Sequence, residues 1–204
     1  MRWFVVAAMW GMCSVVLAGE VFLIPADNPK PTYPRALYLA GIEGEVKVSM
    51  IVHADGSVSQ VSAPEGAHPE LVEASVTAVR QWKFKPWEIS NERPERVDVI
   101  APMLFRLSSD VPLDANEILK KVLCSDLSSE AKNYAQSDWV DMNFFFWTRS
   151  YLAHSIASGL MPRDKRLELI AKLNRGVPSI IRRCNTHPTS RAVRFFPKEV
   201  RELL

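Results

Sequence analysis

The spacing of the apolar residues changes near residue 110, and this change constrains the fold more than any other feature of the sequence. Before it, apolar and polar residues alternate over 46–52 and again over 97–107. Beyond it, apolar residues recur three and four positions apart, as in 118–123 and 167–173. A period of two is typical of a half-buried strand, and a period near 3.6 is typical of an amphipathic helix. The chain is therefore predicted to contain a sheet in its first half and only helices in its second.

The first half is predicted to fold in the order helix, strand, strand, helix, strand. These elements are expected at residues 35–40, 44–53, 57–62, 69–85 and 97–107. Gly41 ends the first helix, and Pro86 ends the second. Asp55-Gly56 closes the hairpin, because Asp-Gly tolerates the positive φ of a tight turn. We expect an α+β fold with a small antiparallel three-stranded sheet and two helices.

The N-terminus has the pattern of an export signal. Arg2 precedes an uncharged apolar run at 3–17, and Val16 and Ala18 place short side chains before a cleavage site. We expect residues 1–18 to be a cleaved signal peptide and 19–30 to be a proline-rich lead-in. The alternative is an uncleaved signal-anchor in the inner membrane.

Five short blocks of the first half resemble the TonB C-terminal domain family, in the same order and at workable spacings. They are Pro-Thr-Tyr-Pro-Arg-Ala at 31–36, Gly-Ile-Glu-Gly-Glu-Val at 41–46, Asp-Gly-Ser-Val at 55–58, Val-Arg-Gln-Trp-Lys-Phe-Lys-Pro at 79–86 and Met-Leu-Phe at 103–105. The resemblance assigns residues 31–108 to a TonB-like domain, which implies a periplasmic location and binding of an envelope protein. Energy transducers of this family also carry a membrane anchor with a His and a Ser and a long proline-rich spacer. Here the apolar run has Ser14 but no His, and the spacer is short, so coupling to a membrane motor is not expected.

Residues 114–204 are predicted to form an all-α domain of three or four helices after a linker at 110–113. Breaks are expected at Gly159 with Pro162 and at Gly176 with Pro178. The aromatic segment 144–147 belongs either to the core of this domain or to a partner-binding surface.

Cys124 and Cys184 are the two cysteines beyond the predicted signal peptide. In an oxidising compartment such a pair is most simply a disulfide, which would tie the first helix of the second half to the last. The alternative is a catalytic thiol at Cys184, with His187 three residues away.

The sequence contains no known catalytic, metal-binding or phosphate-binding motif, so we expect no enzyme activity, no metal and no cofactor. His53 and His68 are expected to be solvent-exposed or to cap a helix. The formal charge of +2 supplies no general reason to bind nucleic acid. Residues 163–201 nevertheless carry 11 Lys and Arg against three acids, which indicates either a solvated helix face or a site for an acidic partner.

A sheet of three strands has two edges, and the strand at 97–107 is predicted to be one of them because Pro102 has no N–H. The predicted binding residues at this edge are Val97, Asp98, Val99, Ile100 and Ala101. There an extended peptide or envelope protein would bind by strand addition. Two alternatives remain open, namely that the helical domain covers the edge and that two copies pair there as a homodimer.

The overall prediction is an exported, periplasmic interaction module that does not transduce energy. One alternative is an envelope stress or folding helper that acts through the helical domain. Another is a membrane-anchored energy transducer for outer-membrane transport.

Overall fold

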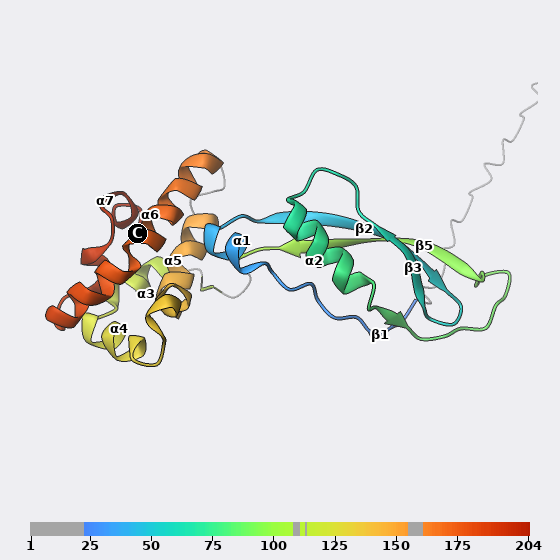
Figure 1. The fold of residues 1–204 in the computed structure, drawn as a ribbon, viewed down its shortest axis with the longest axis horizontal. Coiled ribbons are helices and arrows are strands. Elements are labelled where there is room, and N and C mark those ends of the chain that lie inside the picture. The colour runs from blue at the N-terminus through green and yellow to red at the C-terminus, as the bar shows by residue number, and fades with distance from the viewer. Residues whose placement is uncertain (1–22, 108–110, 113, 155–160) are drawn as a thin grey trace, which may run out of the picture.

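The computed structural model describes residues 23–107, 111–112, 114–154 and 161–204. The signal peptide predicted at 1–18 therefore lies outside the described residues, as does part of the predicted linker. The first half combines strands with two helices (Figure 1). Its elements are β1 (Pro25–Asp27), α1 (Arg35–Ala40), β2 (Gly44–His53), β3 (Val58–Ser62), α2 (Pro69–Val79), β4 (Lys83–Phe84) and β5 (Arg96–Phe105).

The main sheet is antiparallel, with the strand order β3-β2-β5, and α2 packs on one of its faces (Figure 1). The apolar side chains predicted to alternate along β2 are buried beneath α2, whereas Glu45 and Lys47 between them are exposed. The core of this half consists of Leu37, Val46, Val48, Met50, Val52, Leu71, Val79, Phe84, Met103 and Phe105. The α+β class and the small antiparallel sheet are thus confirmed.

The turn between β2 and β3 requires glycine for two reasons. Gly56 has a φ of +83°, and a Cβ atom built on it would lie 2.1 Å from the carbonyl oxygen of Phe84. Asp55 supports the turn because its Oδ1 accepts a hydrogen bond from the Ser57 N–H at 2.8 Å. The Phe84 N–H in turn donates to the Gly56 carbonyl at 2.9 Å, so the turn also holds β4.

The second helix is shorter than predicted. α2 begins at Pro69, where His68 accepts a hydrogen bond from the Glu70 N–H as the N-cap, but it ends at Val79 and does not continue to Pro86. Beyond its end, the Trp82 indole N–H donates to the Pro29 carbonyl at 2.9 Å. The chain then forms β4, which pairs with β1 in a second, two-stranded sheet that the sequence did not predict.

The regular elements of the second half are helices, and an isolated antiparallel bridge joins Leu123 to Arg191. Its elements are α3 (Ala115–Lys121), α4 (Cys124–Ala131), the 3-10 helix η1 (Gln136–Asp141), α5 (Asn143–His154), α6 (Arg163–Thr186), the 3-10 helix η2 (Ala192–Phe195) and α7 (Lys198–Arg201). A separate apolar core fills the space between them. None of the helices in the described part of the chain has the length and apolar character needed to cross a membrane.

The break predicted at Gly176 and Pro178 is wrong, because α6 runs through both residues. Proline inside a helix removes one backbone hydrogen bond. Val177, Ile180 and Ile181 around it are each at most 1% exposed, so burial of this apolar face offsets the loss.

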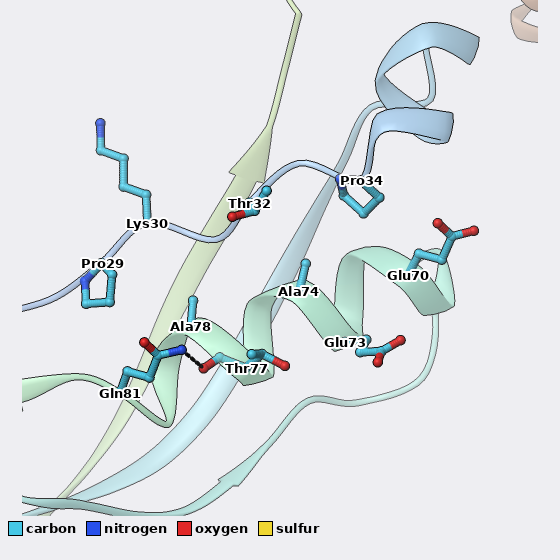
Figure 2. A pocket seen from close by; sticks show the side chains of 10 residues that line it. All are labelled: Pro29, Lys30, Thr32, Pro34, Glu70, Glu73, Ala74, Thr77, Ala78 and Gln81. Carbon is cyan, nitrogen blue, oxygen red and sulfur yellow. Dashed lines mark hydrogen bonds between the residues drawn. The ribbon is translucent and has the colours of Figure 1, made fainter.

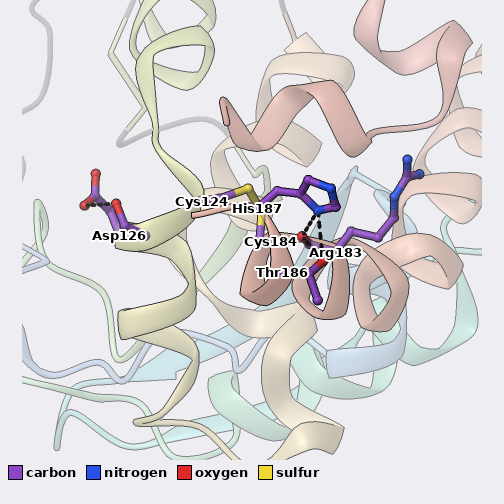
Figure 3. The surroundings of a disulfide bond; sticks show 7 residues. Cys124, Asp126, Arg183, Cys184, Thr186 and His187 are labelled. Atoms are coloured by element: carbon purple, nitrogen blue, oxygen red, sulfur yellow. Dashed lines mark hydrogen bonds between the residues drawn. A yellow bond between two sulfur atoms is a disulfide. The ribbon is translucent and has the colours of Figure 1, made fainter. Parts of the chain in front are cut away.

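A disulfide joins Cys124 at the start of α4 to Cys184 near the end of α6, across 60 residues of sequence (Figure 3). Both cysteines are fully buried. A backbone hydrogen bond also holds the start of α4, since the Cys124 N–H donates to the Ser190 carbonyl at 2.8 Å. The alternative of a catalytic thiol at Cys184 is inconsistent with this bond.

The aromatic segment 144–147 contributes mainly to the core. Phe144 and Phe145 are buried, and Trp147 packs against the same cluster. Phe146 has a different role, because its ring stacks on Tyr38 of α1 with centroids 5.7 Å apart. The segment therefore joins the two halves as well as filling the second core.

Further contacts hold α1 and the end of β5 against the helices. The Asn174 side chain donates to the Leu39 carbonyl at 2.7 Å, and Ser150 donates to the Leu107 carbonyl at 2.9 Å. Arg149 is fully buried at this junction and donates to the Val140 carbonyl at 2.8 Å. Burial lowers the pKa of Arg149, because the charged guanidinium is removed from water.

Candidate peptide-binding edge

β5 is an edge strand whose outward backbone groups can be identified residue by residue. The Ala54 N–H donates to the Glu95 carbonyl at 2.8 Å just beyond the end of the β2-β5 ladder. In an antiparallel pair, hydrogen-bonded and non-hydrogen-bonded positions alternate. With Val52 opposite Val97 and Met50 opposite Val99, the odd-numbered residues of β5 bond to β2. The even-numbered residues therefore direct their N–H and C=O groups away from the sheet.

The outward residues of β5 are Arg96, Asp98, Ile100, Pro102 and Leu104. Ile100 is 67% exposed and Leu104 is 54% exposed, so two aliphatic side chains of this strand face water. Pro102 occupies one of the outward positions, so its missing N–H costs no bond to β2. Within the described residues, β5 pairs with β2 alone, and the outward groups receive no other hydrogen bond.

The opposite edge of the sheet is a poorer template. β3 has only five residues, and its register with β2 shifts around Gln60, which has a φ of 50°. Pro64, two residues after the strand, has no N–H to extend the ladder. Short length and a bulge are devices by which proteins protect an edge from strand addition. β5, with ten residues and an unbroken register, lacks these protections.

The described helices of the second half lie beyond one end of β5 rather than alongside it (Figure 1). They meet the strand where Leu107 is held from both sides, since its N–H donates to Glu43 Oε1 at 2.7 Å and its carbonyl accepts from Ser150. The rest of β5 extends away from the helices toward the far end of the molecule (Figure 1).

The five residues predicted at the edge fall into two groups. Asp98 and Ile100 direct their backbone groups outward, whereas Val97, Val99 and Ala101 bond to β2 and direct their side chains toward the core. Leu104 also faces outward and was not among the predicted residues. The alternation of apolar and polar residues in the sequence separates these two groups. It does not show which group forms backbone hydrogen bonds with the neighbouring strand.

A surface cavity of about 440 Å³ lies between α2 and the extended segment before α1 (Figure 2). Neither a histidine nor a cysteine is among its lining residues, and the Glu70 and Glu73 carboxylates lie at its rim. The segment is anchored by Tyr33, whose hydroxyl donates to the Ile42 carbonyl at 2.7 Å. Burial, reinforced by the nearby Glu43 carboxylate, raises the pKa of Tyr33.

Among the described residues, no group of three or more His, Cys, Asp or Glu side chains is arranged to hold a metal ion. His53 shares a hydrogen bond with Ser59 across the hairpin at 2.6 Å, which accounts for its position on β2.

Comparison with known proteins gives matches that lie in the first half. Residues 29–107 match the family described as Gram-negative bacterial TonB protein C-terminal. Protein TonB of Xanthomonas campestris pv. campestris is 36% identical over 67 residues, which are 32% of this chain and 30% of that protein. Protein tonB2 of Pseudomonas aeruginosa is 34% identical over 82 residues, 40% of this chain and 30% of that protein.

The solution NMR structure of the Pseudomonas aeruginosa TonB CTD is 24% identical, with a TM-score of 0.36, and the match covers 44% of this chain and 90% of that one. The chain spans about 30% of the length of the Xanthomonas and tonB2 relatives. The family match ends at residue 107, before the first helix of the second half. Residues 29–107 of this chain are therefore a domain of the TonB C-terminal family.

Proposed function

We propose that the chain is an exported, periplasmic interaction module that binds an extended segment of an envelope protein by strand addition along β5. Membership of residues 29–107 in the TonB C-terminal family supports an outer-membrane protein as the partner class. The observation that carries the proposal is the outward row of backbone groups at Asp98, Ile100 and Leu104 beside two exposed aliphatic side chains. Main-chain hydrogen bonds give such an interface its affinity, and alternate side chains give it specificity.

The role proposed for the helical half is to fix one end of the edge. Its contacts with Leu107 and α1 hold the sheet at the end where β5 stops. An added strand would then pair with residues 98–104 and would end at the helices. This function is non-catalytic, and it requires no motor-coupled energy transduction.

Residue-resolved amide hydrogen exchange on the chain from residue 19 tests the edge itself. We expect the amides of Val97, Val99 and Ala101 to be protected by β2, while those of Asp98 and Ile100 exchange rapidly. An envelope-protein segment that binds by strand addition should then protect the second set selectively.

Two results would contradict the proposal. Strong protection of Asp98 and Ile100 in the free chain, lost on truncation at residue 109, would mean that the second half occupies the edge. Protection that is lost on dilution would mean that two copies pair there.

Matched variants test binding. Ile100→Pro removes an outward N–H without touching the β2 ladder, so it should weaken binding of the segment. Pro102→Ala adds an outward N–H and should strengthen it. Equal effects of the two substitutions would be inconsistent with strand addition.

A further inference from the structure

The side chains beside the open backbone of β5 form a row whose two ends carry opposite charges. They alternate with the core-facing residues of the strand, so they share the face of the sheet that α2 does not cover. The last of them directly follows β5 and keeps the alternation, since Leu107 after it is 2% exposed. All members of the row are exposed. We call it the edge row: Asp98, Ile100, Pro102, Leu104 and Arg106.

The charges at the two ends of the edge row are not used in ion pairs. Within the described residues, neither Asp98 nor Arg106 lies within ion-pair distance of an opposite charge. Glu43, directly before β2, is bound to the Leu107 N–H through its Oε1 at 2.7 Å. Arg96 lies two positions before Asp98 in the same strand, but the two side chains form no ion pair. Both end charges are therefore available to a partner.

The charges behind the edge row, on β2, oppose each other. Lys47 lies across from Pro102, and Glu45 lies across from Leu104. Both side chains are exposed, and they are next to the apolar part of the edge row. Because their charges are opposite and two positions apart, they compensate each other. The ends of the edge row therefore set the pattern of charge that an added strand meets.

The spacing of these ends defines a partner. An added strand places one side chain beside each member of the edge row, because neighbouring strands share a repeat of two residues. Opposite charges across two strands stabilise a sheet, and like charges destabilise it. Asp98 and Arg106 are eight positions apart, so the matching charges of the added strand are also eight positions apart.

We propose that the β5 edge selects an extended segment with a lysine or arginine beside Asp98 and an aspartate or glutamate beside Arg106. The segment carries aliphatic side chains beside Ile100 and Leu104, which are 67% and 54% exposed. The inference rests on the proposed function, because it names the class of segment that strand addition takes. Charge order then also determines the direction in which a given segment binds.

Three peptides that differ only in their end residues test the inference. All share the central sequence TVTTTVT, and their blocked ends are Lys and Glu in the mixed peptide, two Lys in the basic peptide and two Glu in the acidic peptide. Fluorescence anisotropy gives their dissociation constants for the chain from residue 19. The mixed peptide matches both ends of the edge row in one strand direction, whereas each of the others places a like charge beside one end. It should bind about fivefold more tightly than either, since exchanging an opposite-charge pair for a like-charge pair has about that effect.

Two charge reversals on the same strand provide matched variants. Arg106→Glu makes both ends of the edge row acidic, so the basic peptide should become the tightest by about fivefold. Arg96→Glu changes the net charge by the same amount outside the edge row, so the mixed peptide should remain the tightest. Both arginines are exposed, so neither substitution alters the core.

The outcomes separate the inference from the proposed function. Equal affinities of the three peptides, with protection of the Asp98 and Ile100 amides from exchange, would overturn the inference and leave strand addition intact. The same order of affinities in both variants would also overturn it, because net charge would then explain the order. If no peptide protects these amides, the proposed function fails together with the inference.

Discussion

Replacement of both Cys124 and Cys184 by alanine is expected to lower the free energy of unfolding of the second half by about 4 kcal/mol. The disulfide closes a loop with a sequence separation of 60 residues. For a loop of that length the chain-entropy model gives about 14 cal/mol/K of lost denatured-state entropy, or about 4 kcal/mol at 25 °C. Both cysteines are fully buried between α4 and α6, so water does not replace the lost contact.

Urea unfolding followed by circular dichroism at a helical wavelength measures this change, because most helical residues lie in the second half. With a slope of about 2 kcal/mol per molar urea, the midpoint should fall by about 2 M. The unmodified chain in the presence of a reductant serves as the control, and its urea midpoint should equal that of the double variant. A decrease of less than about 1 kcal/mol would refute the loop-closure argument, since it would mean that the denatured chain is not constrained by the bond.

Two further predictions concern the first half. Gly56→Ala should lower the free energy of unfolding by about 2 kcal/mol or more, because its Cβ would meet the Phe84 carbonyl. Gly66 also has a positive φ but lies in open space, so Gly66→Ala should lower it by only about 1 kcal/mol. Thermal unfolding compares the two variants, and equal losses of stability would exclude the steric reason. Tyr33 has a raised pKa in the folded state, so its contribution to stability is present below its unfolded pKa of 10.0 and is lost as the pH rises above that value. Tyr33→Phe should flatten the fall in thermal midpoint between pH 9 and pH 11; an unchanged slope would show that other groups cause the fall.

Local features of the sequence determined much of the first half. The alternation along 46–52 placed four side chains beneath α2, because successive side chains of a strand point to opposite faces. Asp55-Gly56 determined the hairpin, since the positive φ that the turn needs is a property of the glycine itself. The five short blocks were sufficient to identify the family of residues 29–107.

Only the tertiary structure decided the features that depend on long-range burial. α6 continues through Gly176 and Pro178 because buried neighbours offset a local preference for a break. Beyond α2, Trp82 finds a hydrogen-bond partner in Pro29, 53 positions away in sequence, and β4 pairs with β1.

The same limit applies to the candidate site. Alternation showed that Ile100 and Val99 differ, but the hydrogen-bond register with β2 decided that Ile100 directs its backbone groups outward. The physical reason is that sequence spacing specifies which residues share a face, and only contacts between distant elements specify what that face meets.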